Sequence, residues 1–288
     1  MGGKAARILS TDTLELHPGG IVASQAEDRQ GGEPRTPNFR VIPRWQISAR
    51  IAEPEQALLG ADSLLTAQLL WNRGIRSRPE AQAFLDPCTA STLGDPRTMR
   101  GVPEATARLL SAIRSGERIA VYGDYDVDGV AGAAVLVDAL TGLGADLVVH
   151  LPHRARDGYG VNAAAVRMLA DQGARVIVTV DCGITAVDEA ALARSLGIDV
   201  IITDHHTIPA RLPAALAVIN PHQPACPYPY KALGGGGVAF QVARALLQDA
   251  LPGDEAKQRE SRLAGLAALS TIADIVPLTG ENRAWLEA

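Results

Sequence analysis

The chain has 288 residues, of which 47% are hydrophobic and 4% aromatic, and its formal net charge is −5. This length accommodates one large or two ordinary globular domains, with cores that depend on Ala, Val, Leu and Ile. The sequence contains no run of about 18 apolar residues, so we expect no membrane span. Its three cysteines are scattered, which is typical of proteins of the reducing cytoplasm. The negative charge argues against a broadly basic surface for nucleic acid, although bound metal ions would reverse the sign of an acidic pocket.

The first part of the chain predicts little chemistry. Residues 1–43 are rich in Gly, Ser, Gln, Pro and charge and predict a disordered tail. Residues 44–117 predict a small helical lead-in, with helical runs from Asp62 to Trp71, from Ser77 to Leu85 and from Pro103 to Ser115. Ser77 is expected to cap the second of these helices.

Residues 118–288 alternate between short strands rich in Val and Ile and Ala-rich helices. The expected strands are 119–123, 146–151, 175–180, 199–203 and 216–220. The expected helices are 130–143, 161–172, 186–196, 238–246 and 262–273. Glycines after several helices mark their ends. This pattern is typical of an α/β fold with a mostly parallel sheet and helices on both faces.

An acidic run follows the first of these strands. It places Asp124, Asp126 and Asp128 within five residues, and Gly129 is expected to let the backbone turn. Side chains alternate along a strand, so carboxylates two residues apart at its end would share a face and repel each other unless a cation is bound. A solvated acidic loop is the alternative.

Polar residues also follow later strands. Asp181 follows the strand 175–180, and Asp204, His205 and His206 follow the strand 199–203. Ligands of such sheets bind beyond the carboxyl ends of the strands, so these residues are expected at one edge. The alternatives are a helix cap for Asp181 and a satisfied core histidine for His205.

Asp and His without a thiolate pair favour an ion such as Mn²⁺ over structural zinc. Several carboxylates indicate two bridged ions, which is the usual arrangement for hydrolysing phosphate esters. Asp274 lies among apolar residues, between Ile272 and Val276. An unpaired aspartate buried there would be costly, so we expect a metal ion or a buried partner for it.

Two further segments are candidates for substrate binding. Arg154 and Tyr159 lie on a basic, glycine-containing loop, where arginine suits a phosphate and tyrosine suits stacking on a base. Gly236 and Gly237 belong to the glycine run 234–237, which would let the backbone approach a phosphate before a helix. The alternatives are a solvated turn for the loop and a flexible turn for the glycines.

Taken together, four ordered motifs resemble those of the DHH phosphoesterase superfamily. They are the segments 126–129, 180–183, 204–206 and 273–277. Further segments resemble the bacterial RecJ branch in particular, and the resemblance covers about residue 64 to the C-terminus. These segments are 70–75, 84–87, 121–126, 151–154, 158–160, 219–221 and 237–240.

This resemblance implies a single-stranded DNA exonuclease that removes nucleotides from a 5′ end with two Mn²⁺ or Mg²⁺ ions. By the family pattern, the first ion is held by Asp128, Asp181, His205 and Asp274. The second is held by Asp126 and Asp181, with Asp124 nearby. His206 would contact the scissile phosphate, Asp204 would orient a neighbouring histidine, and Arg154 would hold a phosphate. Roles in DNA repair and recombination and contact with single-strand-binding protein are implied by the resemblance alone.

The sequence departs from the family pattern in two respects. Ser270 stands where many relatives have glycine. The sequence also ends at Ala288, just beyond the fourth motif, whereas RecJ proteins continue into a second, DNA-binding lobe and an OB-fold module. Two other functions therefore stay open: a phosphoesterase for oligonucleotides or cyclic dinucleotides, and a metal-binding module without catalysis.

Overall fold

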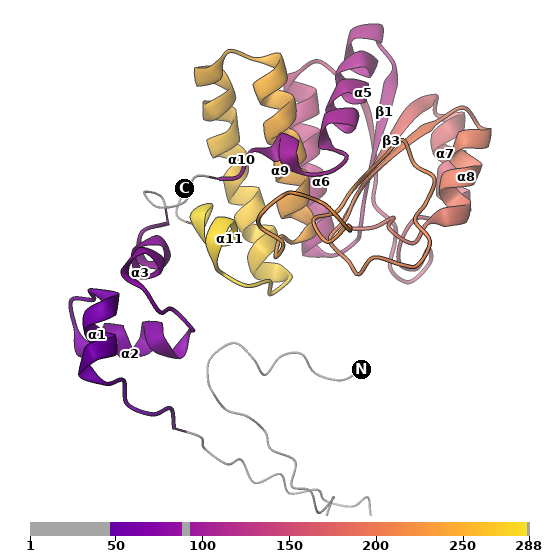
Figure 1. Ribbon diagram of the computed structural model, residues 1–288. Helices are drawn as coiled ribbons and strands as arrows, with labels where there is room; N and C mark the ends of the chain where they lie inside the picture. Colours follow the sequence, from indigo (N-terminus) through magenta and orange to yellow (C-terminus); the bar gives the residue numbers. More distant parts are fainter. Residues whose placement is uncertain (1–46, 88–92, 287–288) are drawn as a thin grey trace, which may run out of the picture. The chain divides into compact units, whose positions relative to one another are not determined.

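The computed structural model describes residues 47–87 and 93–286 (Figure 1). The chain divides into two compact units, with the boundary between Ala81 and Gln82. The predicted tail, residues 1–43, lies outside the described residues. Within the described segments, no helix is long and apolar enough to cross a membrane.

The first unit is helical, as the lead-in pattern predicts. It contains α1 (Glu53–Leu59) and α2 (Leu64–Asn72), and α3 (Arg78–Leu85) continues across the unit boundary. Ser63 caps α2, because its side chain accepts a hydrogen bond from the backbone of the first turn. The Oγ of Ser77 accepts a longer bond of 3.4 Å at the start of α3. Helix α1 was not predicted.

The second unit is built on a five-stranded sheet with the order β2-β1-β3-β4-β5. Every neighbouring pair is parallel, which confirms the predicted α/β class. The strands are β1 (Arg118–Gly123), β2 (Asp146–His150), β3 (Ala174–Val180), β4 (Asp199–Thr203) and β5 (Ala217–Ile219).

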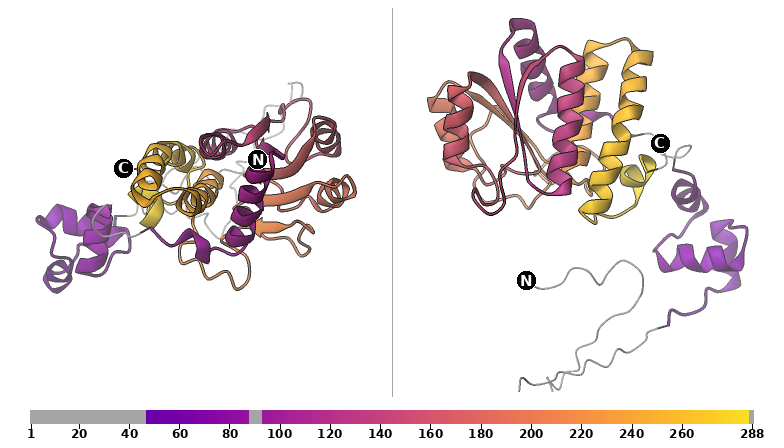
Figure 2. Two further views of the ribbon diagram at one scale, coloured as in Figure 1. Left: turned by 90° about the horizontal axis from the view of Figure 1, so that it is seen from above. Right: turned by 180° about the vertical axis from the view of Figure 1, so that it is seen from behind.

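Helices cover both faces of this sheet (Figures 1 and 2). Along β1, Ile119 and Val121 pack into the larger core, while Ala120 and Tyr122 pack into the smaller one. Helices α5 (Val102–Ser115), α6 (Val127–Gly142), α9 (Gly235–Ala250) and α10 (Gly253–Ala273) contribute to the larger core. Helices α7 (Ala163–Asp171) and α8 (Val187–Ser195) contribute to the smaller core. The short helices η1 (Pro96–Thr98) and α11 (Gly280–Ala284) complete the unit.

Three helices begin earlier than their hydrophobic patterns predict. Helix α6 begins at Val127, α9 at Gly235 and α10 at Gly253. The first half of α10 is charged, so it lacks an apolar pattern; it contains the ion pair Arg259–Glu255 at 2.9 Å, and Ala256 packs into the larger core. The predicted domain limits stay predictions, although the compact unit that holds the sheet already contains α5.

Candidate metal centre

Polar side chains gather beyond the ends of three neighbouring strands. Asp124 follows β1, Asp181 follows β3, and Asp204, His205 and His206 follow β4. Because β1, β3 and β4 are parallel and adjacent, their carboxyl ends meet at one edge of the sheet. The expectation that separate strands deliver these groups to one place is met.

The acidic run after β1 is a strand-to-helix turn and does not continue the strand. Asp126 is the N-cap of α6, and its Oδ1 accepts a hydrogen bond of 3.0 Å from Gly129 N. Asp128 is buried in the first turn of α6, where a carboxylate is favoured by the helix dipole. The predicted strand alternation does not extend to Asp126 and Asp128, and Gly129 lies in the helix, although Asp124 and Asp126 do lie close together.

Asp181 has a backbone φ of +60°, in the left-handed region that few residues other than glycine adopt. Aspartate and asparagine tolerate this conformation better than most residues. The backbone N–H of Asp181 donates to Thr203 O at 3.0 Å, which fixes the turn against β4. Helix α8 begins after Ala186 without a side-chain cap, so the alternative that Asp181 caps this helix is wrong.

The imidazole of His205 faces three carboxylates. Its Nε2 lies 3.1 Å from Asp181 Oδ1, 3.6 Å from Asp128 Oδ2 and 3.7 Å from Asp274 Oδ2. A satisfied core histidine has one partner for each nitrogen, so this surrounding argues against that alternative. Acceptor atoms that converge in this way are suited to a shared cation.

Asp204 holds His206 in place. It is fully buried, and its Oδ1 lies 2.7 Å from His206 Nδ1 and accepts from the backbone N–H groups of both histidines, while Oδ2 accepts from Ile184 N at 2.9 Å. Burial acts against the charge, but the bonds to His206 and the backbone outweigh it and lower the pKa of Asp204. Asp204 is therefore an ionised group that orients a neighbouring histidine.

Side chains that can bind metal ions form three groups. Within each group, the ligand atoms lie within 4.8 Å of one another. Asp181 and His205 each belong to two of these groups, so neighbouring cation positions would share donors. The groups are Asp128 with His205 and Asp274; Asp124 with Asp126 and Asp181; and Asp181 with His205 and His206.

The electrostatics of this cluster also favour a bound cation. Burial raises the pKa of Asp124, Asp181 and Asp274, and neighbouring carboxylates raise it further. Burial opposes a charge on His205, but the carboxylates around it, Asp181 first, raise its pKa. Asp124 Oδ1 is buried without a hydrogen-bond donor in the described part of the chain, and Asp181 Oδ1 faces an imidazole nitrogen, His205 Nε2, at 3.1 Å. The donor set therefore fits a cation.

Asp274 reaches the cluster from the end of α10, but its surroundings differ from the prediction. Its side chain is 32% exposed, and the neighbouring Ile272 and Ile275 are 58% and 57% exposed. The expected burial of Asp274 among apolar residues was therefore wrong. Exposed isoleucines on both sides made the segment look like a core in sequence.

The loop between β2 and α7 lies beside the histidines. Tyr159 is 55% exposed, and its hydroxyl is 3.4 Å from His206 Nδ1. The Arg154 guanidinium lies over the ring of Tyr125, at 5.2 Å from the ring centroid. The hydroxyl of Tyr122 donates to Gly160 O at 3.0 Å, which ties this loop to β1. Both predicted loop residues are thus near the acidic turn or the histidines.

The glycine run is not a flexible turn, because Gly235, Gly236 and Gly237 form the buried first turn of α9. The amides of Gly235 and Gly236 donate to Asp128 at 2.8 and 2.7 Å. The role of Gly236 and Gly237 in substrate binding stays a prediction. The bonds that the structure shows for Gly236 are directed to a carboxylate of the protein.

In the sequence, Ser270 is only a departure from a family pattern, but its contacts in the structure make it a functional candidate. Its Oγ donates a 2.6 Å hydrogen bond to Asp128 Oδ1. The signal in the sequence is its spacing from Asp274, since residues four apart share one face of a helix. Asn220 was also missed; its side chain donates to His206 O at 2.9 Å.

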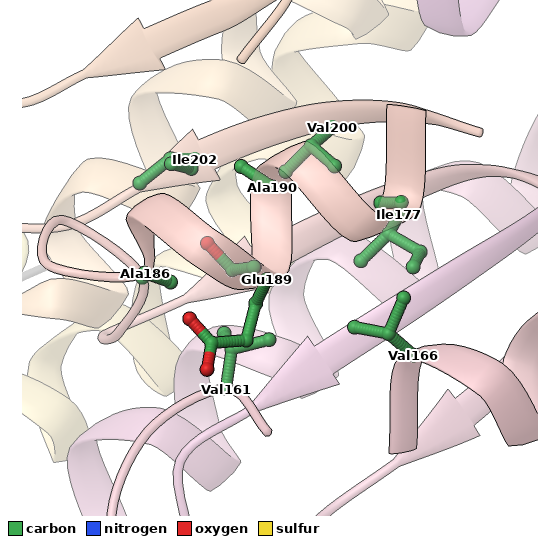
Figure 3. Close-up of a pocket in the computed structure, with 11 residues that line it drawn as sticks. Val161, Val166, Ile177, Ala186, Glu189, Ala190, Val200 and Ile202 are labelled. Carbon is green, nitrogen blue, oxygen red and sulfur yellow. The ribbon is translucent and has the colours of Figure 1, made fainter. Parts of the chain in front are cut away.

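A separate gap lies between the sheet and helices α7 and α8 (Figure 3). Its lining is almost entirely aliphatic, and the carboxylate of Glu189 reaches over Val161 at its rim (Figure 3). Such a lining offers no set of oxygen ligands for a cation. We interpret this gap as a packing feature of the smaller core.

Comparisons with known proteins agree with this geometry. Residues 118–271 match the model of the DHH family, N-terminal domain. The single-stranded-DNA-specific exonuclease RecJ of Bacillus subtilis is 45% identical over 242 residues, which cover 83% of this chain and 30% of that protein. RecJ of Escherichia coli is 41% identical over 226 residues, which cover 76% of this chain and 38% of that protein. The chain thus spans about a third of the length of these curated relatives.

Solved structures give the same result. RecJ from Thermus thermophilus in complex with Mn²⁺ is 34% identical, with a TM-score of 0.69, and the match covers 85% of this chain and 34% of that one. A second exonuclease RecJ structure, bound to manganese, is 41% identical, with a TM-score of 0.60, over 66% of this chain and 47% of that one. The family model covers more than half of the sequence and includes the strands that carry the acidic cluster, so the chain belongs to the DHH family.

Proposed function

We propose that this chain is the metal-binding catalytic part of a phosphodiesterase that removes nucleotides from single-stranded DNA, using two Mn²⁺ or Mg²⁺ ions. The observation that carries the proposal is the convergence of carboxylate oxygens on His205 Nε2, at 3.1, 3.6 and 3.7 Å. Phosphodiester hydrolysis needs positive charge close to the phosphate, and this cluster is suited to bind it.

Two sets of donors would hold the two ions. Asp128, His205 and Asp274 would hold one ion, and Asp124 and Asp126 the other, with Asp181 shared between them. Carboxylate oxygens with a single imidazole suit Mn²⁺ or Mg²⁺ better than zinc. When bound, the ions would neutralise the phosphate and lower the pKa of a water molecule.

The other residues would position the substrate. His206 would contact the scissile phosphate, because Asp204 fixes its Nδ1 side at 2.7 Å and leaves the opposite ring nitrogen for another partner. Arg154 would hold a phosphate of the strand. Tyr159 would stack on a base, since it is an exposed aromatic residue close to His206. Together these groups would align one phosphodiester bond with the cluster.

The choice of single-stranded DNA rests on the relatives, which are named single-stranded-DNA-specific exonucleases. Digestion from the 5′ end, action in the cytoplasm and contact with single-strand-binding protein are what the RecJ resemblance implies. Because the chain spans about a third of these relatives, a longer protein would supply the remaining DNA contacts.

The test is a nuclease assay on the chain with a 5′-phosphorylated single strand, with Mn²⁺ and with EDTA. Wild type should release nucleotides only with Mn²⁺, and Asp181→Asn should lower the rate at least 100-fold, on the order of the loss of a shared electrostatic group. Asparagine is preferred to alanine here because it tolerates the φ of +60° at this position.

The matched control is Asp171→Asn, which removes an exposed carboxylate at the end of α7 and should leave the rate unchanged. A dinucleotide substrate assayed in parallel distinguishes a nuclease for long strands from a phosphoesterase for small substrates. Mn²⁺-dependent cleavage that survives in Asp181→Asn would contradict the proposed site. Mn²⁺ binding without cleavage of either substrate would favour a non-catalytic module.

A further inference from the structure

The carboxylate of Asp128 is enclosed by three hydrogen-bond donors from elements distant in sequence. Gly235 N donates to Oδ2 at 2.8 Å, and Gly236 N donates to Oδ1 at 2.7 Å. Ser270 Oγ donates to Oδ1 at 2.6 Å. We call Gly235, Gly236 and Ser270 the Asp128 cradle. It joins the first turns of α6 and α9 to the last turn of α10.

The two glycines of the cradle have no room for a side chain. A Cβ on Gly235 would lie 2.5 Å from the Cβ of Asp181, and a Cβ on Gly236 would lie 2.3 Å from Ser270 Oγ. Gly132 on α6 meets the same limit, because a Cβ there would lie 2.8 Å from Gly236 Cα. Glycine is therefore required here by the close approach of backbone to carboxylate and of α6 to α9.

Residues 236 and 270 compete for one space. With serine at position 270, the nearest atoms to an added Cβ at position 236 are the Oγ and Cβ of Ser270, at 2.3 and 2.5 Å. The next atom, Asp128 Oδ1, is 3.4 Å away, an ordinary contact. Removal of the serine side chain would thus make room for an alanine at position 236.

The cradle also determines how many acceptor sites Asp128 has left. An ionised carboxylate has about four lone-pair sites, and the cradle uses three of them. Oδ2 accepts one cradle bond, from Gly235 N, and lies 3.6 Å from His205 Nε2. The remaining site is therefore on the oxygen that faces the histidine.

We propose that the cradle positions Asp128 as a ligand that gives a single oxygen, Oδ2, to the cation, and that Ser270 and Gly236 form an interdependent pair. The proposal rests on the proposed metal site. In this arrangement Ser270 is a positioning residue, which prevents the carboxylate from rotating away from His205 or binding through both oxygens. Residues that orient metal ligands in this way typically change metal affinity about 10- to 100-fold when they are replaced.

The experiment uses the full chain and two measurements: Mn²⁺ affinity by calorimetric titration, and the Tm in EDTA. Ser270→Ala should weaken Mn²⁺ binding about 10-fold, and its Tm in EDTA should fall only by what the loss of one hydrogen bond to a buried carboxylate costs. Ser261→Ala, an exposed serine on the same helix, is the matched control and should leave both measurements unchanged. Wild-type affinity in Ser270→Ala would overturn the positioning role of Ser270.

The interdependence is tested without metal. Gly236→Ala should lower the Tm when residue 270 is serine, and the double variant Gly236→Ala/Ser270→Gly should recover most of that loss. An equal loss of Tm in both backgrounds would overturn the shared space. Failure of the proposed function would appear differently, as a wild-type chain that binds no Mn²⁺. That result would overturn the ligand role of Asp128, while the two Tm values would still decide the pairing of residues 236 and 270.

Discussion

The second unit contains two buried acidic sites, Glu281 and the carboxylates at the sheet edge. The two sites differ in how their oxygen atoms find hydrogen-bond donors. Glu281 in α11 accepts three hydrogen bonds, from Gly94 N at 3.1 Å and from Tyr228 Oη and Gln241 Nε2 at 2.6 Å each. At the sheet edge, by contrast, Asp124 Oδ1 is buried without a donor among the described residues, and His205 Nε2 is shared among three carboxylates at 3.1, 3.6 and 3.7 Å. The fold thus supplies hydrogen-bond donors for the Glu281 carboxylate, but not for every carboxylate oxygen at the sheet edge.

The difference extends to positive charge. The guanidinium of Arg244 stands near Glu281, bonds to Gln241 Oε1 at 2.7 Å and helps to lower the pKa of Glu281 against the effect of burial. In the described segments, no arginine or lysine forms an ion pair with the carboxylates around His205. The Glu281 group is therefore a structural network, whereas the sheet-edge group is incomplete without a cation.

Loss of Glu281 should give the largest change in stability. Glu281→Ala leaves the buried donors of Gly94, Tyr228 and Gln241 without an acceptor, and each buried donor left in this way costs about 1–3 kcal/mol. We expect the free energy of unfolding to fall by about 3 kcal/mol or more in urea titrations, equally with and without Mn²⁺. Glu104→Ala, an exposed glutamate in α5, is the control. A Glu281→Ala variant as stable as wild type would remove the structural half of the comparison.

Mn²⁺ should produce the next largest change, and only through the sheet-edge group. At a free concentration of 100 times Kd, one bound ion raises the free energy of unfolding by about 2.7 kcal/mol. Wild type and Glu281→Ala should both gain this increment, measured as a rise in Tm on adding Mn²⁺, because Glu281 is not a ligand. Asp181→Asn should gain much less, since it lacks the shared carboxylate. Equal gains in all three proteins would place the ion elsewhere.

The sequence was most informative where burial and local chemistry coincide. Strands β1, β3 and β4 are short, apolar and almost fully buried, so their positions and the parallel arrangement followed from pattern alone. The residues at the strand ends were predicted for the same reason. The first half of α10 was missed because its charged residues carry no apolar period.

The remaining errors concern information that is not local. Exposed Ile272 and Ile275 made the surroundings of Asp274 look buried, because hydrophobicity does not tell which side chains are covered. The bond between Ser270 and Asp128 joins residues separated by 142 positions. The glycine run resembled a turn, and only the packing of α10 against α9, with Ser270 next to Gly236, shows why position 236 has no room for a side chain.

The pH dependence of stability at Glu281 is a smaller expected effect, and it tests the same comparison. Burial raises the pKa of Glu281 above its ordinary value of 4.5, although its hydrogen bonds act in the opposite direction. Between pH 4.5, the ordinary pKa of the unfolded chain, and the raised pKa of the folded protein, the folded protein binds more protons than the unfolded chain. The free energy of unfolding therefore falls as pH rises through this window. In Glu281→Gln this titration is absent. Stability of wild type relative to Glu281→Gln, measured by urea unfolding in EDTA, should therefore be highest below pH 4.5 and decline to a plateau at higher pH. A difference that rises with pH would show that the donors around Glu281 outweigh its burial, so that the network favours the ionised form.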